Sequence, residues 1–469
     1  MSASLQWGGR FAAPPDAALI AFGSSLEDDL PLAPFDVRCS LAHVEALEGG
    51  GAIGAQYADA LRAALAQVAD EVRDGSFAAW ARALGAEDVH GAIDARVREL
   101  APEAGAYLHA GRSRNDQVAT TLALYARDRA ERGARHALAI ARTLCSAAND
   151  EAAAGTLLAA TTHWQPAQPV LLAFWLAAAT EPFVRAAQRF TAARKAASAT
   201  CPLGSAAVAG STIPLARERS AAFLGFAAPS RNAMDAIGTR DAALDVAHAF
   251  VRAVLDASRV AEEIVLWAAP AFGYVRIGDA TATGSSLMPQ KRNPDALELV
   301  RGGASELVGL YGGALSSLAG LALSYHRDLQ QTKRLCVLAI ERGVAILDAF
   351  ARAIADVTFV REAMNARAAD GYAVATDIAD ALILRGCSAR EAHALVGERV
   401  RRAEEEGRAL DTGDLAALAS AIGVPALEAP LDAAASVSAK ATVGSTSPDA
   451  VRASLAELAS EIAALEARL

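Results

Sequence analysis

The feature that most restricts how this chain can fold is one long helical run, from Asp241 to Trp267. At 1.5 Å per residue, about 27 residues make a helix of about 40 Å. A helix that is apolar around most of its circumference must be buried on several sides. We therefore expect this helix in the middle of a helical bundle, a position that a bundle shared between subunits would also provide. Its charged residues recur at intervals of 7, 4, 3 and 4 and form one narrow stripe: Asp245, Arg252, Asp256, Arg259 and Glu263.

The rest of the chain has the same helical character. Apolar residues make up 53% of it, much of this alanine, whereas aromatic residues make up only 5%. Small apolar side chains with few β-branched runs favour closely packed helices over sheets. Further apolar helices are expected from Leu122 onward, over Val170–Phe190 and Ala296–Leu323, and on to about Val360. The predicted fold class is all-α.

Breaks in this pattern predict three mostly helical domains, a number that 469 residues can accommodate. Residues 1–37 are rich in glycine and proline and are expected to form an extended arm. The stretch from Pro102 to Gly111 is the first boundary, and from Arg361 the pattern changes to short amphipathic helices. The expected domains are an N-terminal helical domain with the arm (1–111), a central long-helix bundle (112–360) and a small C-terminal helical domain (361–469).

Composition disfavours several classes of protein. A net charge of −10 argues against nucleic acid as a partner, because phosphate binding needs clustered Lys and Arg. No apolar run of about 18 residues lacks charge, and the first residues do not resemble a signal peptide, so neither a membrane nor an export route is expected. Five scattered cysteines without a Cys-x-x-Cys pair predict neither a disulfide framework nor a thiolate zinc site. We therefore expect a cytoplasmic protein.

The strongest interruption of the helical pattern is Thr283–Asp295. Gly284 allows backbone angles closed to other residues, and Pro289 and Pro294 interrupt helices. Asn293 is expected to cap the next helix, with Pro294 as its first residue and Asp295 in its first turn. The sequence therefore predicts a flexible loop that leads into the positive end of a helix.

Three side chains of this loop are candidates for a chemical role: Ser285, Ser286 and Lys291. Hydroxyls, an ammonium group and backbone N–H groups at a helix N-terminus form a site for a carboxylate. For Gly-Ser-Ser alone, an ordinary interhelix turn is the better explanation, and only the whole run favours a binding site. It also stays open whether Asn293 caps the helix or contacts a ligand.

Two further polar runs lead into helices. Gly111–Val118 places Arg112 and Arg114 at a helix start, where they oppose the helix dipole. A capping role explains the polar residues of this run, but the arginines suggest pairing with acids or an anion. Thr161–Pro169 is a break that holds His163, for which structure and chemistry are equally good explanations.

Two polar features have mainly structural explanations at this point. His90 lies near the start of a helix that follows Glu87-Asp88, where histidines are most often structural. Tyr325–Lys333 is a dense polar patch within a helical pattern, which a solvated helix face would also explain.

Taken together, these runs resemble the argininosuccinate lyase family. The run Gly284–Asp295 alone resembles the wider fumarase/aspartase superfamily, and Gly111–Val118 with Thr162–Pro169 narrows the resemblance to this family. Trp7–Phe11, Glu87–His90, Tyr325–Lys333 and Ala373–His393 also match.

The resemblance implies an all-α enzyme and a homotetramer whose active sites draw on several subunits. The implied reaction is the reversible elimination of fumarate from argininosuccinate to give arginine, with no metal and no organic cofactor. A base removes a proton beside a carboxylate, an aci-carboxylate dianion forms, and the C–N bond then breaks.

The resemblance also implies roles for individual residues. Ser285 is the base, His163 the proton donor or a relay, and Glu298 the acid that pairs with that histidine, while Lys291 holds carboxylate charge. Positions expected to bind substrate are Ser25, His90, Arg114, Asn115, Thr162, Ser286, Asn293, Tyr325, Gln330 and Lys333.

The chain departs from the family pattern in several places. Gln331-Thr332 stands where two acids are usual, His326 where asparagine is common, and Asp94 where glutamate is usual. In the family pattern the two acids lie near the arginine end of the substrate. Their absence here therefore bears on substrate specificity rather than on the elimination chemistry. The alternatives are a lyase for another succinyl-amine, such as adenylosuccinate, or a non-catalytic structural protein like the lens crystallins of this family.

Overall fold

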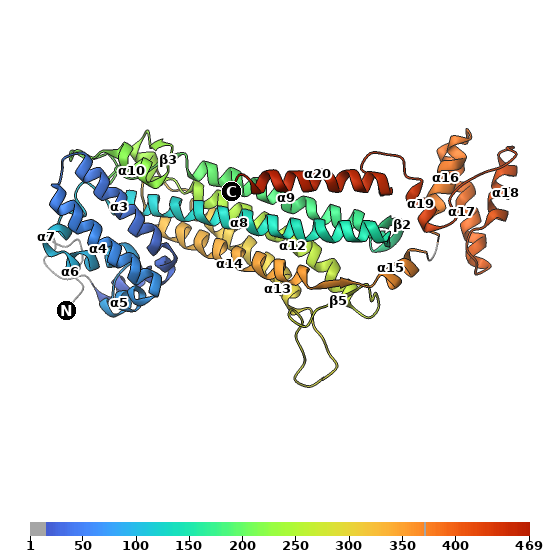
Figure 1. The fold of residues 1–469 in the computed structure, drawn as a ribbon, viewed down its shortest axis with the longest axis horizontal. Coiled ribbons are helices and arrows are strands. Elements are labelled where there is room, and N and C mark those ends of the chain that lie inside the picture. The colour runs from blue at the N-terminus through green and yellow to red at the C-terminus, as the bar shows by residue number, and fades with distance from the viewer. Residues whose placement is uncertain (1–15, 370–371) are drawn as a thin grey trace. The chain divides into compact units, whose positions relative to one another are not determined.

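The computed structural model describes residues 16–369 and 372–469, and they are mainly helical (Figure 1). The all-α prediction is confirmed, because the strands of the described residues form only three two-stranded sheets. The matching run Trp7–Phe11 lies outside the described residues. Within them, no helix combines the length and the apolar character needed to cross a membrane.

The N-terminal part of the chain consists of short and medium helices. The extended arm predicted up to residue 37 is wrong for the described part, because helix already begins at Ala17. Its first turn is capped by Asp16, whose carboxylate accepts the N–H groups of Ala18 and Leu19. The elements are α1 (Ala17–Gly23), α2 (Leu26–Asp29), the 3₁₀ turn η1 (Leu30–Leu32), α3 (Ala33–Gly49), α4 (Ala55–Asp74), α5 (Ser76–Leu84), α6 (Val89–Leu100) and α7 (Pro102–Gly105).

Five long helices follow. The helix predicted over Asp241–Trp267 is confirmed as α12 (Asp241–Ala268), and most of its apolar side chains are buried. The others are α8 (Arg114–Ala154), α9 (Leu172–Ala197), α13 (Asp295–Ser316) and α14 (Leu329–Ala355). The prediction that α13 extends to Leu323 is wrong, and the polar patch before α14 is irregular rather than helical up to Asp328. Gly320, with φ of 82°, adopts a left-handed conformation that breaks the helical path.

The remaining helices are short, apart from those over Ala389–Glu405 and Pro448–Glu466. Residues 372–431 contain an apolar core of their own, built around Ile378, Leu382, Val396 and Leu418. The elements are α10 (Arg217–Leu224), α11 (Ala233–Gly238), α15 (Arg361–Ala368), α16 (Ala375–Leu384), α17 (Ala389–Glu405), α18 (Thr412–Ala421), α19 (Ala433–Ser438) and α20 (Pro448–Glu466).

The break expected at Thr161–Pro169 is instead a β-hairpin, so this prediction is wrong in structure type. Strand β1 (Leu157–Thr162) pairs antiparallel with β2 (Gln165–Leu171). Both strands are edges, and an edge strand tolerates prolines such as Pro166 and Pro169. The other pairs are β3 (Thr200–Cys201) with β4 (Ala228–Pro229) and β5 (Val275–Ile277) with β6 (Val357–Phe359).

The chain forms two compact units. The first comprises the chain up to Ala134 with Gln188–Val254 and Gly303–Ile346, and the second comprises Arg135–Ala187, Leu255–Gly302 and Leu347–Leu469. The long helices contribute residues to both units. The expected domain boundaries at 111/112 and 360/361 remain predictions.

Within the first unit, two glycines let the long helices approach closely. A Cβ atom on Gly133 of α8 would lie 2.5 Å from the Phe190 ring of α9. Phe190 packs edge-on against Phe250 of α12, with ring centroids 4.6 Å apart. A Cβ atom on Gly343 of α14 would lie 2.8 Å from Phe250. Since neither glycine has a side chain, the rings of Phe190 and Phe250 fill the space between α8, α9, α12 and α14.

A buried carboxylate ties three helices of the first unit together. Asp36 of α3 is fully buried and accepts hydrogen bonds from His90 of α6 and from Gln117 and Thr121 of α8. Burial disfavours its charge, but His90, Arg112 and the Gln117 amide outweigh that effect, so the pKa of Asp36 is lowered to about 2. The carboxylate is therefore ionised at neutral pH and fixes the side chains that surround it.

The close helix packing predicts opposite effects for two Gly→Ala changes. Gly133→Ala should lower the free energy of unfolding by about 1–3 kcal/mol, because the Phe190 ring has no space into which to move. Gly397→Ala is the control: Gly397 is exposed within α17 and a Cβ there meets nothing within 4 Å. It should stabilise by about 0.5–1 kcal/mol. Urea unfolding measures both, and unchanged stability of Gly133→Ala would contradict the packing.

The Asp36 hub predicts a pH-dependent loss of stability on Asp36→Asn. The amide directs an N–H toward groups that already donate, and the loss should be about 3 kcal/mol at pH 7. Because the folded pKa lies below the unfolded value of 3.8, the stabilisation is complete above about pH 4 and disappears as pH falls toward 2. The gap between wild type and variant in urea unfolding should therefore narrow below pH 4.

The control for this experiment is Asp70→Asn, which changes an exposed carboxylate on α4. It should change stability little at any of these pH values. A gap between wild type and Asp36→Asn that stayed constant from pH 7 to pH 2 would show that the Asp36 charge does not stabilise the fold.

Candidate active site

The run Thr283–Asp295 forms a loop between β5 and α13 that stands out from the helices around it (Figure 1). Its ends are tied by a two-way backbone pair: Thr283 N–H donates to Asn293 O at 3.1 Å, and Asn293 N–H donates to Thr283 O at 2.8 Å. Arg292 adds a hydrogen bond to Ile277 O at 2.7 Å and an ion pair with Asp279 at 2.6 Å. The ends of the loop are therefore anchored, whereas most side chains between them are exposed.

The two serines of this loop differ in their surroundings. Ser285 Oγ accepts hydrogen bonds from the N–H groups of Leu287 at 3.2 Å and Met288 at 3.1 Å. Among the described residues, no comparable donors reach Ser286. Hydrogen bonds donated to an oxygen favour its ionised form. Of the two hydroxyls, that of Ser285 is therefore the one whose alkoxide the loop stabilises.

The prediction that Asn293 caps α13 is wrong. The helix begins at Asp295, and the carbonyl of Pro294 accepts the N–H of Glu298 at 3.1 Å. Asn293 instead uses its backbone in the pair with Thr283, and its Nδ2 donates to Gly284 O at 3.5 Å. The side-chain oxygen of Asn293 is therefore not used as a cap.

A pocket of about 810 Å³ lies beside this loop in the second unit. Lys291, Asn293 and Glu298 line it, together with the end of α12 and strand β5. Glu298 lies 3.6 Å from Arg301, one turn further along α13. The structure thus brings three of the predicted residues to one cavity, with an ammonium group, an amide and a carboxylate at its wall.

His163 and Trp164 form the two-residue turn of the β1–β2 hairpin, and both are exposed. Their φ angles are 54° and 59°, in the left-handed region that hairpin turns of this length require. For residues other than glycine this conformation costs on the order of 1 kcal/mol or more each. A histidine that is kept at such a position despite the strain is a candidate for a functional role. Thr162 is the last residue of β1, directly before this turn.

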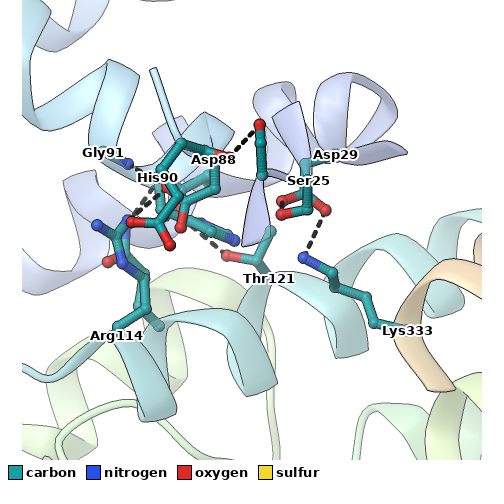
Figure 2. Close-up of polar contacts among 12 residues, drawn as sticks. Ser25, Asp29, Asp88, His90, Gly91, Arg114, Thr121 and Lys333 are labelled. Atoms are coloured by element: carbon teal, nitrogen blue, oxygen red, sulfur yellow. Dashed lines mark hydrogen bonds and ion pairs between the residues drawn. The ribbon is translucent and has the colours of Figure 1, made fainter. Parts of the chain in front are cut away.

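In the first unit, Ser25 and Lys333 meet at a buried carboxylate. Asp29 is fully buried, accepts a hydrogen bond from Ser25 Oγ at 2.6 Å and pairs with Lys333 Nζ at 2.5 Å. Figure 2 shows the Lys333 side chain extending from α14 toward Asp29. The lysine is thereby held at a defined place by a partner from α2.

Arg114 and His90 belong to the same cluster of polar side chains as Ser25, Asp29 and Lys333 (Figure 2). Asp88 caps α6 by accepting the Gly91 N–H at 2.7 Å, and it pairs with Arg114 at 3.0 Å. Burial opposes its ionisation, but Arg114, His90, the Gly91 N–H and Lys333 offset that effect, so the pKa of Asp88 lies below its usual value. His90 is buried, with Nδ1 on Asp36 at 2.9 Å, while its Nε2 has no partner among the described residues. His90 is thus both structural and able to bind a further group.

The segment before α14 contacts the N-terminal helices of the same unit. Gln330 donates to Gly23 O at 3.1 Å, and Arg327 donates to Gly23 O at 2.8 Å and to Glu87 at 2.6 Å. Burial raises the pKa of Tyr325 above its usual value, against the opposing charge of Arg240. Tyr325 and Arg327 belong to the irregular segment, whereas Gln330 lies in the first turn of α14.

Asn115 lies at the start of α8 and holds a neighbouring turn. Its Nδ2 donates to Ala207 O at 3.0 Å. The next residue, Asp116, accepts the N–H groups of Gly204 and Ala206 at 2.9 and 2.8 Å. The polar run Gly111–Val118 therefore anchors the turn at 204–207 as well as carrying candidate ligands.

The predicted site residues divide between the two compact units. The first holds Ser25, His90, Arg114, Asn115, Tyr325, Gln330 and Lys333, and the second holds Thr162, His163, Ser285, Ser286, Lys291, Asn293 and Glu298. No hydrogen bond or ion pair among the described residues joins His163 to Glu298. The role of each residue in catalysis remains a prediction.

Three residues that sequence reasoning did not single out support the site: Asp29, Asp36 and Arg327. Their only signal is an acid or base within or near a polar run, because each acts through a partner distant in sequence. The structure also clarifies two departures from the family pattern. Thr332 is fully buried and contacts Ser317 Oγ at 2.6 Å, and Asp94 is buried and pairs with Arg98 at 3.0 Å. Neither side chain is exposed to solvent in the single chain.

Comparison with known proteins gives one consistent result. The sequence model of the Lyase family matches residues 9–309, and the model of the argininosuccinate lyase C-terminal region matches residues 372–438. The argininosuccinate lyase of Mycobacterium leprae (strain Br4923) is 41% identical over 94% of this chain and 93% of its own length. That of Methylococcus capsulatus (strain ATCC 33009 / NCIMB 11132 / Bath) is 39% identical over 98% of each chain.

Solved structures agree with these sequence relationships. An EDDS lyase in complex with formate is 25% identical, covers 97% of this chain and 94% of its own, and superposes with a TM-score of 0.79. A class II fumarase from Schistosoma mansoni, at 16% identity over 86% of this chain and 88% of its own, has a TM-score of 0.68 and shows the shared fold alone. The chain therefore belongs to the argininosuccinate lyase family of the fumarase/aspartase superfamily.

Proposed function

We propose that this lyase catalyses the reversible elimination of fumarate from argininosuccinate to give arginine. Relatives at about 40% identity over nearly the whole chain carry that name, and the C-terminal region matches the model specific to them. The proposal depends most on Ser285, whose hydroxyl oxygen receives two backbone N–H groups in the 283–295 loop.

Ser285 is proposed as the base that removes the proton beside the succinyl carboxylate. A serine hydroxyl is a weak base, so its alkoxide must be stabilised by its surroundings. The N–H groups of Leu287 and Met288 supply two donors in fixed positions. The cation of Lys291, six residues on, would add to this stabilisation when the loop closes over substrate.

Loss of the proton leaves a dianion, so the site must hold fixed positive charge and donors around it. Lys291 and Asn293 are proposed to bind the succinyl carboxylates, with Ser286 beside them; the first two line the pocket next to the loop. His163 is proposed to give a proton to the departing guanidino nitrogen, directly or through a relay. Glu298 would raise the basicity of that histidine in the assembled enzyme.

The remaining substrate contacts are proposed from the first unit. Lys333 and Arg114 carry positive charge, and each is oriented by a carboxylate: Lys333 by the fully buried Asp29 and Arg114 by the half-buried Asp88. Such support from a second layer of residues keeps a ligand-binding group in one orientation. The other proposed contacts are Ser25, His90, Asn115, Thr162, Tyr325 and Gln330.

We further propose a homotetramer in which His163 and Ser285 of one site come from different subunits. The long helices expose apolar side chains that a single chain leaves uncovered: Leu255 of α12, Leu299, Val308 and Leu315 of α13, and Leu338 of α14. Exposed apolar side chains on long helices are typical of surfaces that bind another chain. Assembly would also explain why His163 and Glu298 do not meet within one chain.

A direct assay tests the proposed reaction. Purified protein with argininosuccinate should release fumarate, which is followed by its ultraviolet absorbance. Adenylosuccinate is the comparison substrate, and its turnover should be lower by several orders of magnitude. If the protein turned over adenylosuccinate but not argininosuccinate, the proposed substrate would be excluded, while an elimination reaction typical of the superfamily would still be supported.

The assignment of the base predicts a large difference between two neighbouring changes. Ser285→Ala should lower kcat by several orders of magnitude, since it removes the oxygen that receives both N–H groups. Ser286→Ala should act mainly on KM, because its role is to bind the substrate. Light scattering should give the mass of a tetramer for both variants and for wild type. Near-normal turnover of Ser285→Ala would refute the assignment, and a monomeric wild type would refute the assembly.

A further inference from the structure

An aromatic pocket in the second unit has no part in the proposed reaction. It encloses about 260 Å³ and is lined by five aromatic side chains. The chain contains five tryptophans, and three of them are here. The aromatic residues are Trp164, Trp175, Trp267, Phe272 and Tyr274, and Glu263 lies among them.

The local structure explains this gathering. Glu263 and Trp267 lie one turn apart on α12 and so share a helix face. Gly273, with φ of 65°, turns the chain back after α12, and Tyr274 N–H then donates to Trp267 O at 2.9 Å. The ring centroids of Trp175 and Trp267 are 4.5 Å apart, and those of Trp267 and Tyr274 are 6.0 Å apart. The rings therefore form a connected wall.

The carboxylate in this wall has no cationic partner. Glu263 Oε2 accepts the indole N–H of Trp175 at 2.6 Å, and no Lys or Arg among the described residues forms an ion pair with it. Burial raises the pKa of Glu263 above its usual value, against the Trp175 hydrogen bond and the charge of Arg259. Arg367 also lines the pocket, and its charge favours the ionised form of Tyr274. A half-buried carboxylate that forms no ion pair with a described Lys or Arg thus lies among five aromatic side chains, and only the longer-range charge of Arg259 and the Trp175 N–H favour its ionised form.

These observations favour one class of ligand. Aromatic faces carry negative potential and attract cations, by about 0.5–2 kcal/mol per contact. A carboxylate repels anions, and an apolar ligand would bury its charge without compensation. We propose that the pocket of Trp164, Trp175, Trp267, Phe272, Tyr274 and Glu263 binds an organic cation, a guanidinium or ammonium group on a short aliphatic stem.

Arginine is such a cation, and the proposed reaction releases it as a product. That identification rests on the proposed function, whereas the preference of the pocket for cations does not. The pocket includes Trp164, the neighbour of His163 in the hairpin turn. A bound cation would therefore contact the segment that carries the proposed proton donor.

Tryptophan fluorescence provides a direct test. The protein is titrated at pH 8 with agmatine and with tetramethylammonium, against sodium chloride at equal ionic strength. Both organic cations should give a saturable change in emission that sodium does not give. Glu263→Gln keeps an acceptor for the Trp175 N–H but removes the charge, and it should weaken binding at least tenfold. A change of equal size and midpoint in wild type and Glu263→Gln, or none in wild type, would overturn the proposal.

Three further variants locate the signal. Trp80→Phe removes a tryptophan of α5, outside the pocket, and should leave the titration unchanged, whereas Trp267→Phe should lose most of the signal. Phe272→Ala changes a partly exposed ring at the pocket and should weaken binding even where Glu263→Gln proves unstable. Turnover of argininosuccinate by Glu263→Gln without added cation should match wild type. That measurement separates failure of the cation site from failure of the proposed reaction.

Discussion

The burial of the long helices is the constraint on which the rest of the structure depends. A helix such as α12, apolar around most of its surface, has to be covered on several sides, and Gly133 and Gly343 allow neighbouring helices to come close enough to do so. The interior of such a packing offers no free backbone donors, because each helix satisfies its own. Chemical groups are therefore placed at helix ends and in connections: Ser285 before α13, Arg114 at the first residue of α8, and His163 in the hairpin before α9.

Three carboxylates, of which Asp29 and Asp36 are fully buried, fix the positions of several other candidate site residues. Asp29, Asp36 and Asp88 each hold a cation or a histidine that the family pattern assigns to substrate. Removing an acid from water is costly, and the cost is recovered only where the partners are well placed. Such pairs define orientation more than they add stability. Asp36, with partners on two other helices, also joins the packing of the fold to the geometry of the site.

Features that depend on residues close in sequence could be predicted, whereas features that depend on contacts between distant residues could not. The extent of α12 and the start of α6 after Glu87-Asp88 depend on local sequence patterns, and both were predicted correctly. The hairpin at Leu157–Leu171 was missed because its pairing depends on register rather than on local preference. The cap predicted at Asn293 is wrong because the backbone of Asn293 pairs with that of Thr283, ten residues earlier. For the site, motif resemblance selects residues such as Ser285, but the contact of His90 with Asp36 spans 54 residues and has no local signal.

Because the 283–295 loop is anchored at its base, substitutions within it are expected to affect folding and activity differently. The pair between Thr283 and Asn293 closes the loop at its base, and the exposed segment beyond it contributes little to the packed interior. Substitutions in this exposed segment are therefore expected to disturb the packed interior little. If Ser285 and Lys291 have the proposed roles, variants altered between residues 285 and 291 would fold normally but lack activity. In the proposed tetramer such copies would still supply the rest of their surface to neighbouring subunits, so the phenotype of one allele would depend on the other.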